Sequence, residues 1–161
     1  MPSPTPHMIA KKDGAIGWMI FNNPERLNAV SLEMWQAVPE ILRSFEADDE
    51  IRVIVLTGAG DRAFVAGADI SQFGESRSTA EGILAYETAT EIAFNGIADA
   101  SKPTIAMIDG YCIGGGLGIA LSCDMRIAAE GSTFGIPAAK LGLAYGAGGT
   151  GRLVHVVGPS F

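Results

Sequence analysis

The sequence predicts an α/β domain built around a mostly parallel sheet. Two runs rich in β-branched and other apolar residues, 51–57 (IRVIVLT) and 104–108 (TIAMI), are typical of strands that are buried on both faces. Between them, residues 82–97 carry small and apolar side chains at helical spacing. Strands that alternate with helices predict βαβ units, in which successive strands run parallel.

The first elements of the chain are predicted to be a leader and a hairpin. Residues 1–7 include three prolines and predict a disordered leader, ahead of a single core domain over residues 8–161. Two short apolar runs, 8–11 and 15–21, are joined by Asp13-Gly14, which is a hairpin signal.

A helix is predicted to follow the hairpin. Ser31 is a suitable N-cap, and the apolar residues after it fall on one helical face: Leu32, Trp35, Val38, Ile41, Leu42 and Phe45. Pro39 lies inside this pattern and is expected to kink the helix or end it early. A proline in a helix interior costs roughly 3 kcal/mol.

The second half of the chain alternates glycine-rich turns with short regular elements. A polar, glycine-rich loop is expected to reach residue 78, and the triple glycine 114–116 is expected to open a helix that ends near residue 122. Residues 125–129 predict a strand. The segment GLAYGAGGTG predicts a turn, and the apolar residues 153–157 follow it.

Composition excludes several classes of protein. Eighteen acidic against eleven basic residues give a net charge of −7, which argues against a nucleic acid or an anionic membrane as the main partner. The two cysteines, Cys112 and Cys123, show neither disulfide-scaffold nor zinc spacing, so no metal is predicted. The N-terminus lacks a signal-peptide core and no apolar run is long enough to span a membrane, so we expect a cytoplasmic protein.

Glycine is the unusual component, because 21 residues are about twice the usual share. Two segments, GAGDRA at 58–63 and GAGGTG at 146–151, resemble the dinucleotide-binding fingerprint in their letters. That motif needs a strand, a turn and then a helix whose N-terminus meets the pyrophosphate. Neither segment has this full context, so a dinucleotide-binding domain is kept only as a third interpretation.

A different site is predicted where glycines follow the buried strands. In GYCIGGGLGIALSCD a strand ends, a triple glycine follows and a helix begins, so free amide groups at the helix N-terminus could bind a developing oxyanion. The same glycines would equally serve close packing of helix on strand. AFVAGADI could supply a second amide, and two such donors on one thioester carbonyl would form an oxyanion hole.

Four motifs give the chain a specific resemblance. FNNPERLNAVS, AFVAGADI, IDGYCIGGGLGIALSCDMRIA and FGIPAAKLGLAYGAGGTGRL occur in an order and spacing similar to the crotonase superfamily, the enoyl-CoA hydratase/isomerase proteins. The resemblance implies a spiral of ββα repeats, as in ClpP and crotonase, that binds an acyl-CoA and stabilises a thioester enolate. It implies no separate cofactor, since coenzyme A is part of the substrate, and it implies a homo-oligomer, either a trimer or a dimer of trimers.

The resemblance also assigns residues. The two oxyanion-hole amides would belong to Ala68 and Gly115, and the residues matching positions that line the coenzyme A site are Ala66, Asp69 and Ile70. Arg26 matches a commonly basic position near the coenzyme A phosphates, although it could equally be a solvated loop charge.

The chain departs from the family where hydratases carry two catalytic glutamates. Those positions are occupied by Gly118 and Ala138, neither of which can transfer a proton, so ordinary hydration is not expected. Tyr145 stands where hydratases have a proline and is a candidate substitute, and the helix bordering the acyl pocket offers Tyr86, Glu87 and Glu91. Asp124 is expected to hold backbone in place, and neither His7 nor His155 lies where a catalytic triad would need it.

The sequence also ends where family members normally continue into a C-terminal helical third. We therefore expect a fold that lacks that portion, with apolar surface left over, in keeping with a charged fraction of only 18%. The function predicted first is an enzyme, hydratase-like or isomerase, that acts on acyl-CoA. The alternative is a catalytically inactive acyl-CoA-binding protein or assembly partner.

Overall fold

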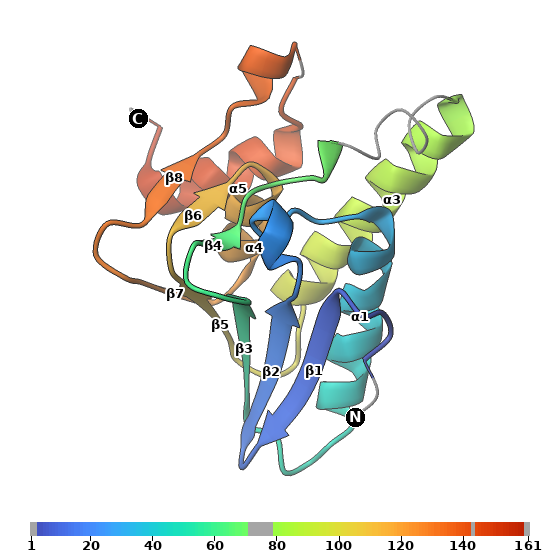
Figure 1. The fold of residues 1–161 in the computed structure, drawn as a ribbon, viewed down its shortest axis with the longest axis vertical. Helices are drawn as coiled ribbons and strands as arrows, with labels where there is room; N and C mark the ends of the chain where they lie inside the picture. Colours follow the sequence, from blue (N-terminus) through green and yellow to red (C-terminus); the bar gives the residue numbers. More distant parts are fainter. Residues whose placement is uncertain (1–2, 71–78, 143, 160–161) are drawn as a thin grey trace.

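The computed structural model describes residues 3–70, 79–142 and 144–159, and its larger sheet has five strands (Figure 1). Their order in the sheet follows the chain: β1 (Met8–Asp13), β2 (Ile16–Phe21), β3 (Val53–Gly58), β5 (Thr104–Ile108) and β7 (Met125–Ala128). The β1–β2 hairpin is antiparallel and the other three pairs are parallel, which confirms the predicted sheet. The hairpin turn falls on Gly14 and Ala15, one residue later than predicted.

A second, smaller sheet lies beside the first and was not predicted. It consists of three parallel strands in the order β4 (Ala63–Val65), β6 (Tyr111–Ile113) and β8 (Thr133–Gly135). Each has only three residues, which is too short to show a period of two in the sequence. Because β3, β5 and β7 of the large sheet lead into β4, β6 and β8 in turn, the chain forms a spiral of repeats.

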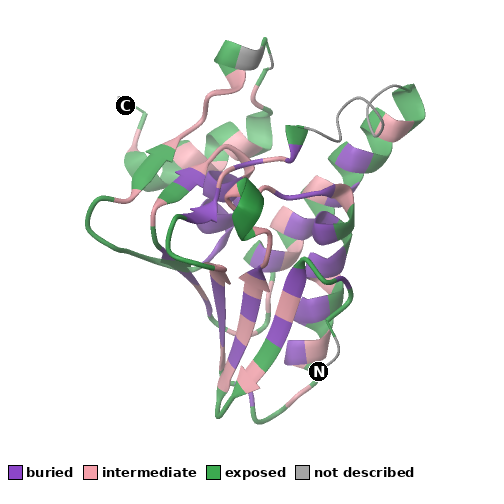
Figure 2. Ribbon diagram, in the orientation of Figure 1, coloured by how far each residue is buried: buried purple, intermediate pink, exposed green. Residues whose placement is uncertain are grey.

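Helices complete the repeats and enclose the core (Figure 1). They are the α-helices α1 (Leu32–Glu46), α3 (Ala80–Ala98), α4 (Gly115–Ser122) and α5 (Ala147–Val157), with the short 3-10 helices η1 (Pro24–Arg26) and η3 (Ala138–Leu141). Helices α1 and α3 pack on each other, and α4 packs between α3 and α5. Buried residues concentrate on the inner faces of the large sheet, α1 and α4 (Figure 2).

Helix α1 does not end early at Pro39, which was one of the two outcomes expected there. Helix α1 runs through Pro39 to Glu46, and Ser31 caps it by accepting a hydrogen bond from the amide of Met34 at 3.3 Å. Proline removes one internal hydrogen bond, but the apolar face of α1 is buried along its whole length, from Met34 to Phe45. Burial of that many large side chains outweighs one missing bond.

Residues 3–7, part of the predicted leader, make contacts with the rest of the chain. The hydroxyl of Thr5 is held by Glu33 of α1 at 3.0 Å, and the amide of Ala10 donates to the hydroxyl of Ser3 at 3.1 Å. Thr5 is buried. The first contact ties the segment to the first turn of α1 and the second ties it to β1.

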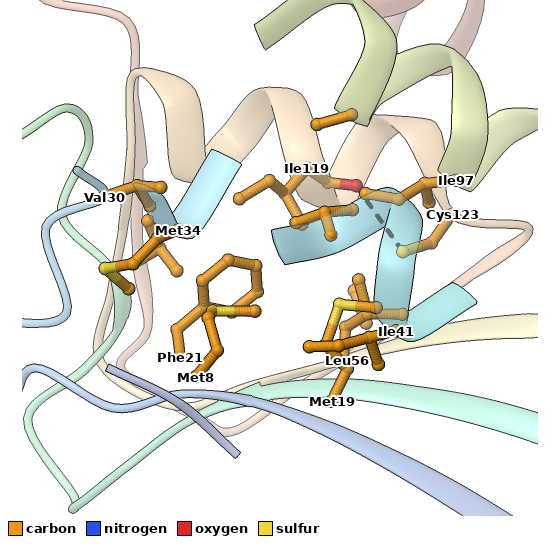
Figure 3. Packing of buried hydrophobic residues seen from close by; sticks show 14 of the residues in the cluster. Met8, Met19, Phe21, Val30, Met34, Ile41, Leu56, Ile97, Ile119 and Cys123 are labelled. Atoms are coloured by element: carbon orange, nitrogen blue, oxygen red, sulfur yellow. Dashed lines mark hydrogen bonds between the residues drawn. The ribbon is translucent and has the colours of Figure 1, made fainter. Parts of the chain in front are cut away.

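The core draws on elements from β1 to the end of α4 (Figure 3). It brings together side chains from the hairpin, α1, α3 and α4, among them Met8, Met19, Phe21, Met34, Ile41, Ile97 and Ile119. The two cysteines are part of it, and the thiol of Cys123 donates to the carbonyl of Ile119 at 3.4 Å. Burial raises the pKa of Cys112 and of Cys123 to about 12, so both act as small apolar residues at neutral pH.

Asn28 connects the loop before α1 to the loop after β3. It is fully buried, and its backbone adopts a left-handed conformation with φ of 56°. Its side-chain amide donates to the carbonyls of Ala59 and Ala63 at 2.9 and 2.8 Å, and its side-chain oxygen accepts from the amide of Asn23 at 3.0 Å. All the polar atoms of this side chain therefore act within the protein.

We expect Asn28→Ala to lower the free energy of unfolding by about 2–3 kcal/mol, because it leaves buried backbone groups without partners. Urea unfolding followed by circular dichroism measures the change. The matched control is Asn22→Ala, which removes a single exposed hydrogen bond to the carbonyl of Pro6 and should cost less than about 1 kcal/mol. Equal effects of the two substitutions would contradict the role assigned to Asn28.

Candidate active site

The repeats surround a cavity of about 1080 Å³ between α3, the N-termini of α4 and α5, and the loop after β4. The structure brings most of the predicted site residues to its wall: Arg26, Ala66, Ala68, Asp69, Ile70, Gly115, Ala138 and Tyr145. Tyr86, Glu87 and Glu91 of α3 line it as well. Gly118 does not.

The amide of Ala68 is left free by the way its segment pairs. Val30 forms a parallel bridge with Ala68, donating to the carbonyl of Gly67 at 2.8 Å and accepting from the amide of Asp69 at 2.9 Å. Successive peptide groups in an extended segment point to opposite sides, so the amide of Ala68 points away from Val30. No acceptor for it lies within the described ranges.

The amide of Gly115 is free for a different reason. Gly115 is the first residue of α4, and the first amides of a helix have no acceptor within it. A Cβ added at Gly115 would lie 3.9 Å from the amide nitrogen of Ala68, and one added at Gly67 would lie 4.0 Å from that of Gly115. Two amides that have no acceptor among the described residues therefore border the same space, although they come from separate turns of the spiral.

Each glycine of the triple glycine has its own reason to be there. Gly114 has φ of 54°, a left-handed conformation that favours glycine. A Cβ at Gly115 would lie 3.2 Å from the indole of Trp35, and one at Gly116 would overlap the carbonyl of Val65 in β4. The segment therefore packs closely on β4, and it also places the amide of Gly115 beside the cavity. Both interpretations of the triple glycine thus stay open.

Arg26 and Asp69 form an ion pair on the cavity wall. One guanidinium nitrogen lies 3.0 and 3.1 Å from the two carboxylate oxygens of Asp69. Asp69 is only 8% exposed, whereas the Arg26 side chain is 54% exposed. The arginine is therefore anchored at its carboxylate side and reaches solvent at the other. Ile70 beside it is largely exposed, so the cavity opens at this end.

The two positions without a carboxylate differ. Ala138, in η3, lines the cavity. Gly118 is buried under Phe94 of α3, whose ring occupies the place of a side chain there: a Cβ at Gly118 would lie 2.6 Å from Cζ of Phe94.

Tyr145 lies over the first turn of α5. Its ring packs on Gly149, where an added Cβ would be 2.5 Å from the ring, so a larger residue would displace it. Burial raises the pKa of Tyr145 and the charge of Arg152 opposes that rise, with the result that the phenol is protonated at neutral pH.

The other candidates divide by exposure. Tyr86 is buried, and its hydroxyl accepts from the indole of Trp35 at 2.8 Å, whereas Glu87 and Glu91 are exposed on the cavity rim. Asp124 holds backbone, as predicted: it accepts from the amide and the hydroxyl of Thr104 at 2.8 and 2.9 Å, joining β5 to the start of β7.

Sequence analysis missed Phe94, Asn95 and Arg152, which also line the cavity. The amide oxygen of Asn95 accepts from Arg152 at 2.6 Å, and the guanidinium lies 5.9 Å from the centre of the Phe94 ring. The signal was helical spacing, since Phe94 and Asn95 follow Glu91 by three and four residues on one face.

Neither glycine segment has the dinucleotide-binding geometry. GAGDRA follows β3 but runs into β4 where the motif needs a helix, and GAGGTG opens α5 but follows η3 where the motif needs a strand. No three histidine, cysteine or acidic side chains of residues 3–70, 79–142 and 144–159 are grouped so that they could hold a metal ion. None of the helices in these ranges has the length and apolar character needed to cross a membrane.

The fold and the cavity thus define an α/β spiral in which two main-chain amides border one cavity. The family model for enoyl-CoA hydratase/isomerase matches residues 11–161. The short-chain-enoyl-CoA hydratase of Clostridium acetobutylicum is 38% identical over 152 residues, which are 94% of this chain and 58% of that protein. The crotonyl-CoA hydratase of Syntrophomonas wolfei is 34% identical, over 95% of this chain and 58% of its own length. The chain belongs to the enoyl-CoA hydratase/isomerase family.

Solved structures confirm the predicted fold class. An enoyl-CoA hydratase/isomerase family protein from Hyphomonas neptunium superposes with a TM-score of 0.93 and 38% identity, covering 98% of this chain and 60% of that one. The enoyl-CoA hydratase of Bacillus anthracis has a TM-score of 0.89 and 30% identity, covering 96% and 59%. The chain therefore spans about three fifths of the length of these relatives.

The packing of Phe94 on Gly118 can be tested through stability. We expect Gly118→Ala to lower the free energy of unfolding by about 1–3 kcal/mol through overpacking, despite the helix propensity of alanine. In a Phe94→Ala background the same substitution should cost little, and urea unfolding of the four proteins measures this coupling. Gly96→Ala, in α3, is the control, because its Cβ would make only an ordinary contact with Leu42 at 3.4 Å. A cost at Gly118 that is unchanged without the ring would contradict this packing.

Proposed function

We propose that this chain binds an acyl-CoA thioester in the cavity and stabilises its enolate. The thioester carbonyl would accept hydrogen bonds from the amides of Ala68 and Gly115. The observation that carries the proposal is the convergence of these two unpaired amides from separate turns of the fold. Relatives whose names give them CoA thioester substrates, such as the crotonyl-CoA hydratase, support the substrate class.

Coenzyme A would enter at the open end of the cavity, along Ala66, Asp69 and Ile70. Arg26 would offer the exposed side of its guanidinium to the phosphates, while Asp69 holds the group in place. No cofactor is proposed besides the coenzyme A of the substrate.

The reaction we propose is proton transfer at the enolate carbon and not ordinary hydration. Gly118 is covered by Phe94 and Ala138 has no titratable group, so the two glutamates of a hydratase have no counterparts at these positions. Tyr145 supplies a protonated phenol on the cavity wall, which would donate a proton to the enolate carbon, and a rim carboxylate, Glu87 or Glu91, would take the α-proton when the enolate forms. A catalytically inactive acyl-CoA-binding protein is the second candidate, and the ring over Gly118 favours it.

Gly115→Pro tests the oxyanion hole, because proline has no amide hydrogen yet suits the first position of a helix. We expect calorimetric titration with acetoacetyl-CoA, whose enolate resembles the intermediate, to show affinity lowered about tenfold or more. Gly115→Ala is the matched control, since it brings a Cβ equally close to Trp35 but keeps the amide. The assignment fails if the two variants bind alike.

Tyr145→Phe tests the proton-transfer group. With butyryl-CoA in D₂O, we expect the variant to slow exchange of the α-hydrogens by a factor of about 10² or more, as measured by NMR. Full exchange by the variant would remove Tyr145 from the mechanism and leave Glu87 and Glu91. Binding of acetoacetyl-CoA without any exchange by the unaltered chain would establish the inactive acyl-CoA-binding protein instead.

A homo-oligomer, trimer or dimer of trimers, is proposed for assembly. It is supported by large apolar side chains exposed on the edge strands β7 and β8, namely Met125, Ile127 and Phe134. The cytoplasm remains the predicted location.

A further inference from the structure

The cavity wall beside α3 is built from aromatic rings held in fixed positions. Four of the residues that line the cavity are aromatic: Trp35 and Tyr86, which are buried, and Phe94 and Tyr145, which are partly exposed. Trp35 meets Phe94 edge to face, with ring centres 5.3 Å apart at 75°. The indole of Trp35 donates to the hydroxyl of Tyr86, and the ring of Tyr145 lies on Gly149. Each ring is thus oriented by a neighbour before any ligand enters.

Phe94 is the central member of this wall. Its ring lies between Trp35 and the guanidinium of Arg152, which the amide oxygen of Asn95 holds at 2.6 Å. The absence of a side chain at Gly118 gives the ring its space. Phe94 is only partly buried, so part of its surface faces the cavity.

We propose that the acyl group selected by this cavity carries an aromatic ring, and that Phe94 is a specificity-determining residue for it. The inference rests on the proposed binding of acyl-CoA. An aromatic acyl group gains edge-to-face and offset contacts with fixed rings beyond the burial that any apolar group gains. It can also stack on the guanidinium of Arg152. Because the rings are already oriented, their ordering adds little to the cost of binding.

Charges of both signs line the cavity, so they do not favour a charged acyl group. Glu87 and Glu91 of α3, four residues apart, would repel an acyl group that ends in a carboxylate, whereas the guanidinium of Arg152 would attract it. A linear alkyl chain would be accepted, but only for its burial against residues such as Ile113 and Ile136.

Calorimetric titration with phenylacetyl-CoA and cyclohexylacetyl-CoA tests this inference, because the two acyl groups differ little in shape but only the first has an aromatic face. We expect the unaltered chain to bind the phenyl ligand about fivefold more tightly. Phe94→Leu should reduce this ratio to about two, because Tyr145 and Arg152 remain. The control is Ile92→Leu, at a side chain of α3 that is 51% exposed and lines a separate groove, and it should keep the fivefold ratio.

Each outcome decides the inference. Equal affinities in the unaltered chain overturn it, whether or not Phe94→Leu folds, and a fivefold ratio that survives in Phe94→Leu overturns the role of Phe94. Acetoacetyl-CoA, titrated alongside, tests the proposed function by itself. If it binds but no ring preference is found, the aromatic inference alone fails, whereas no binding of any of the three thioesters overturns both.

Discussion

The close packing of α4 on β4 is the constraint on which the candidate site depends. Gly116 lies so near the carbonyl of Val65 that no side chain could stand between helix and strand. This contact brings the start of α4 beside the segment after β4, and with it the amide of Gly115 beside that of Ala68. A separation of even one methyl group would move the two donors apart, and hydrogen bonds weaken steeply with distance and angle.

Charged and aromatic side chains lie at different parts of the cavity wall. The ion pair of Arg26 and Asp69 lies at the open end and the glutamates lie on the rim, whereas the wall next to α3 is aromatic. In such surroundings a main-chain amide is a stronger donor than it would be in water. A main-chain amide can donate to an enolate oxygen without first changing its protonation state or a rotamer. This property supports the proposed enolate stabilisation.

Local patterns in the sequence predicted several elements of the fold, and the motifs predicted part of the candidate site. The buried runs predicted β3 and β5, and the spacing after Ser31 predicted α1, because local patterns of burial determine these elements. Motif resemblance located part of the cavity wall, including Arg26, Ala68 and Gly115, because the motifs carry the glycine-rich turns from which that part is built. Three features could not be predicted: the ring of Phe94 over Gly118, the contacts of residues 3–7 and the passage of α1 through Pro39. Each depends on a partner far away in the chain, and periodicity carries no record of such partners.

The strands of the large sheet are arranged in the order in which they are synthesised. In this sheet, each strand after the hairpin pairs with a strand that has already been synthesised, and no later segment is inserted between two earlier ones. The sheet can therefore grow at a single edge during translation, because each new strand is added beside the previous one. A nascent chain synthesised as far as β5 already contains the hairpin, α1, β3 and β4. These elements are therefore complete before the glycine-rich segments that begin α4 and α5 are made.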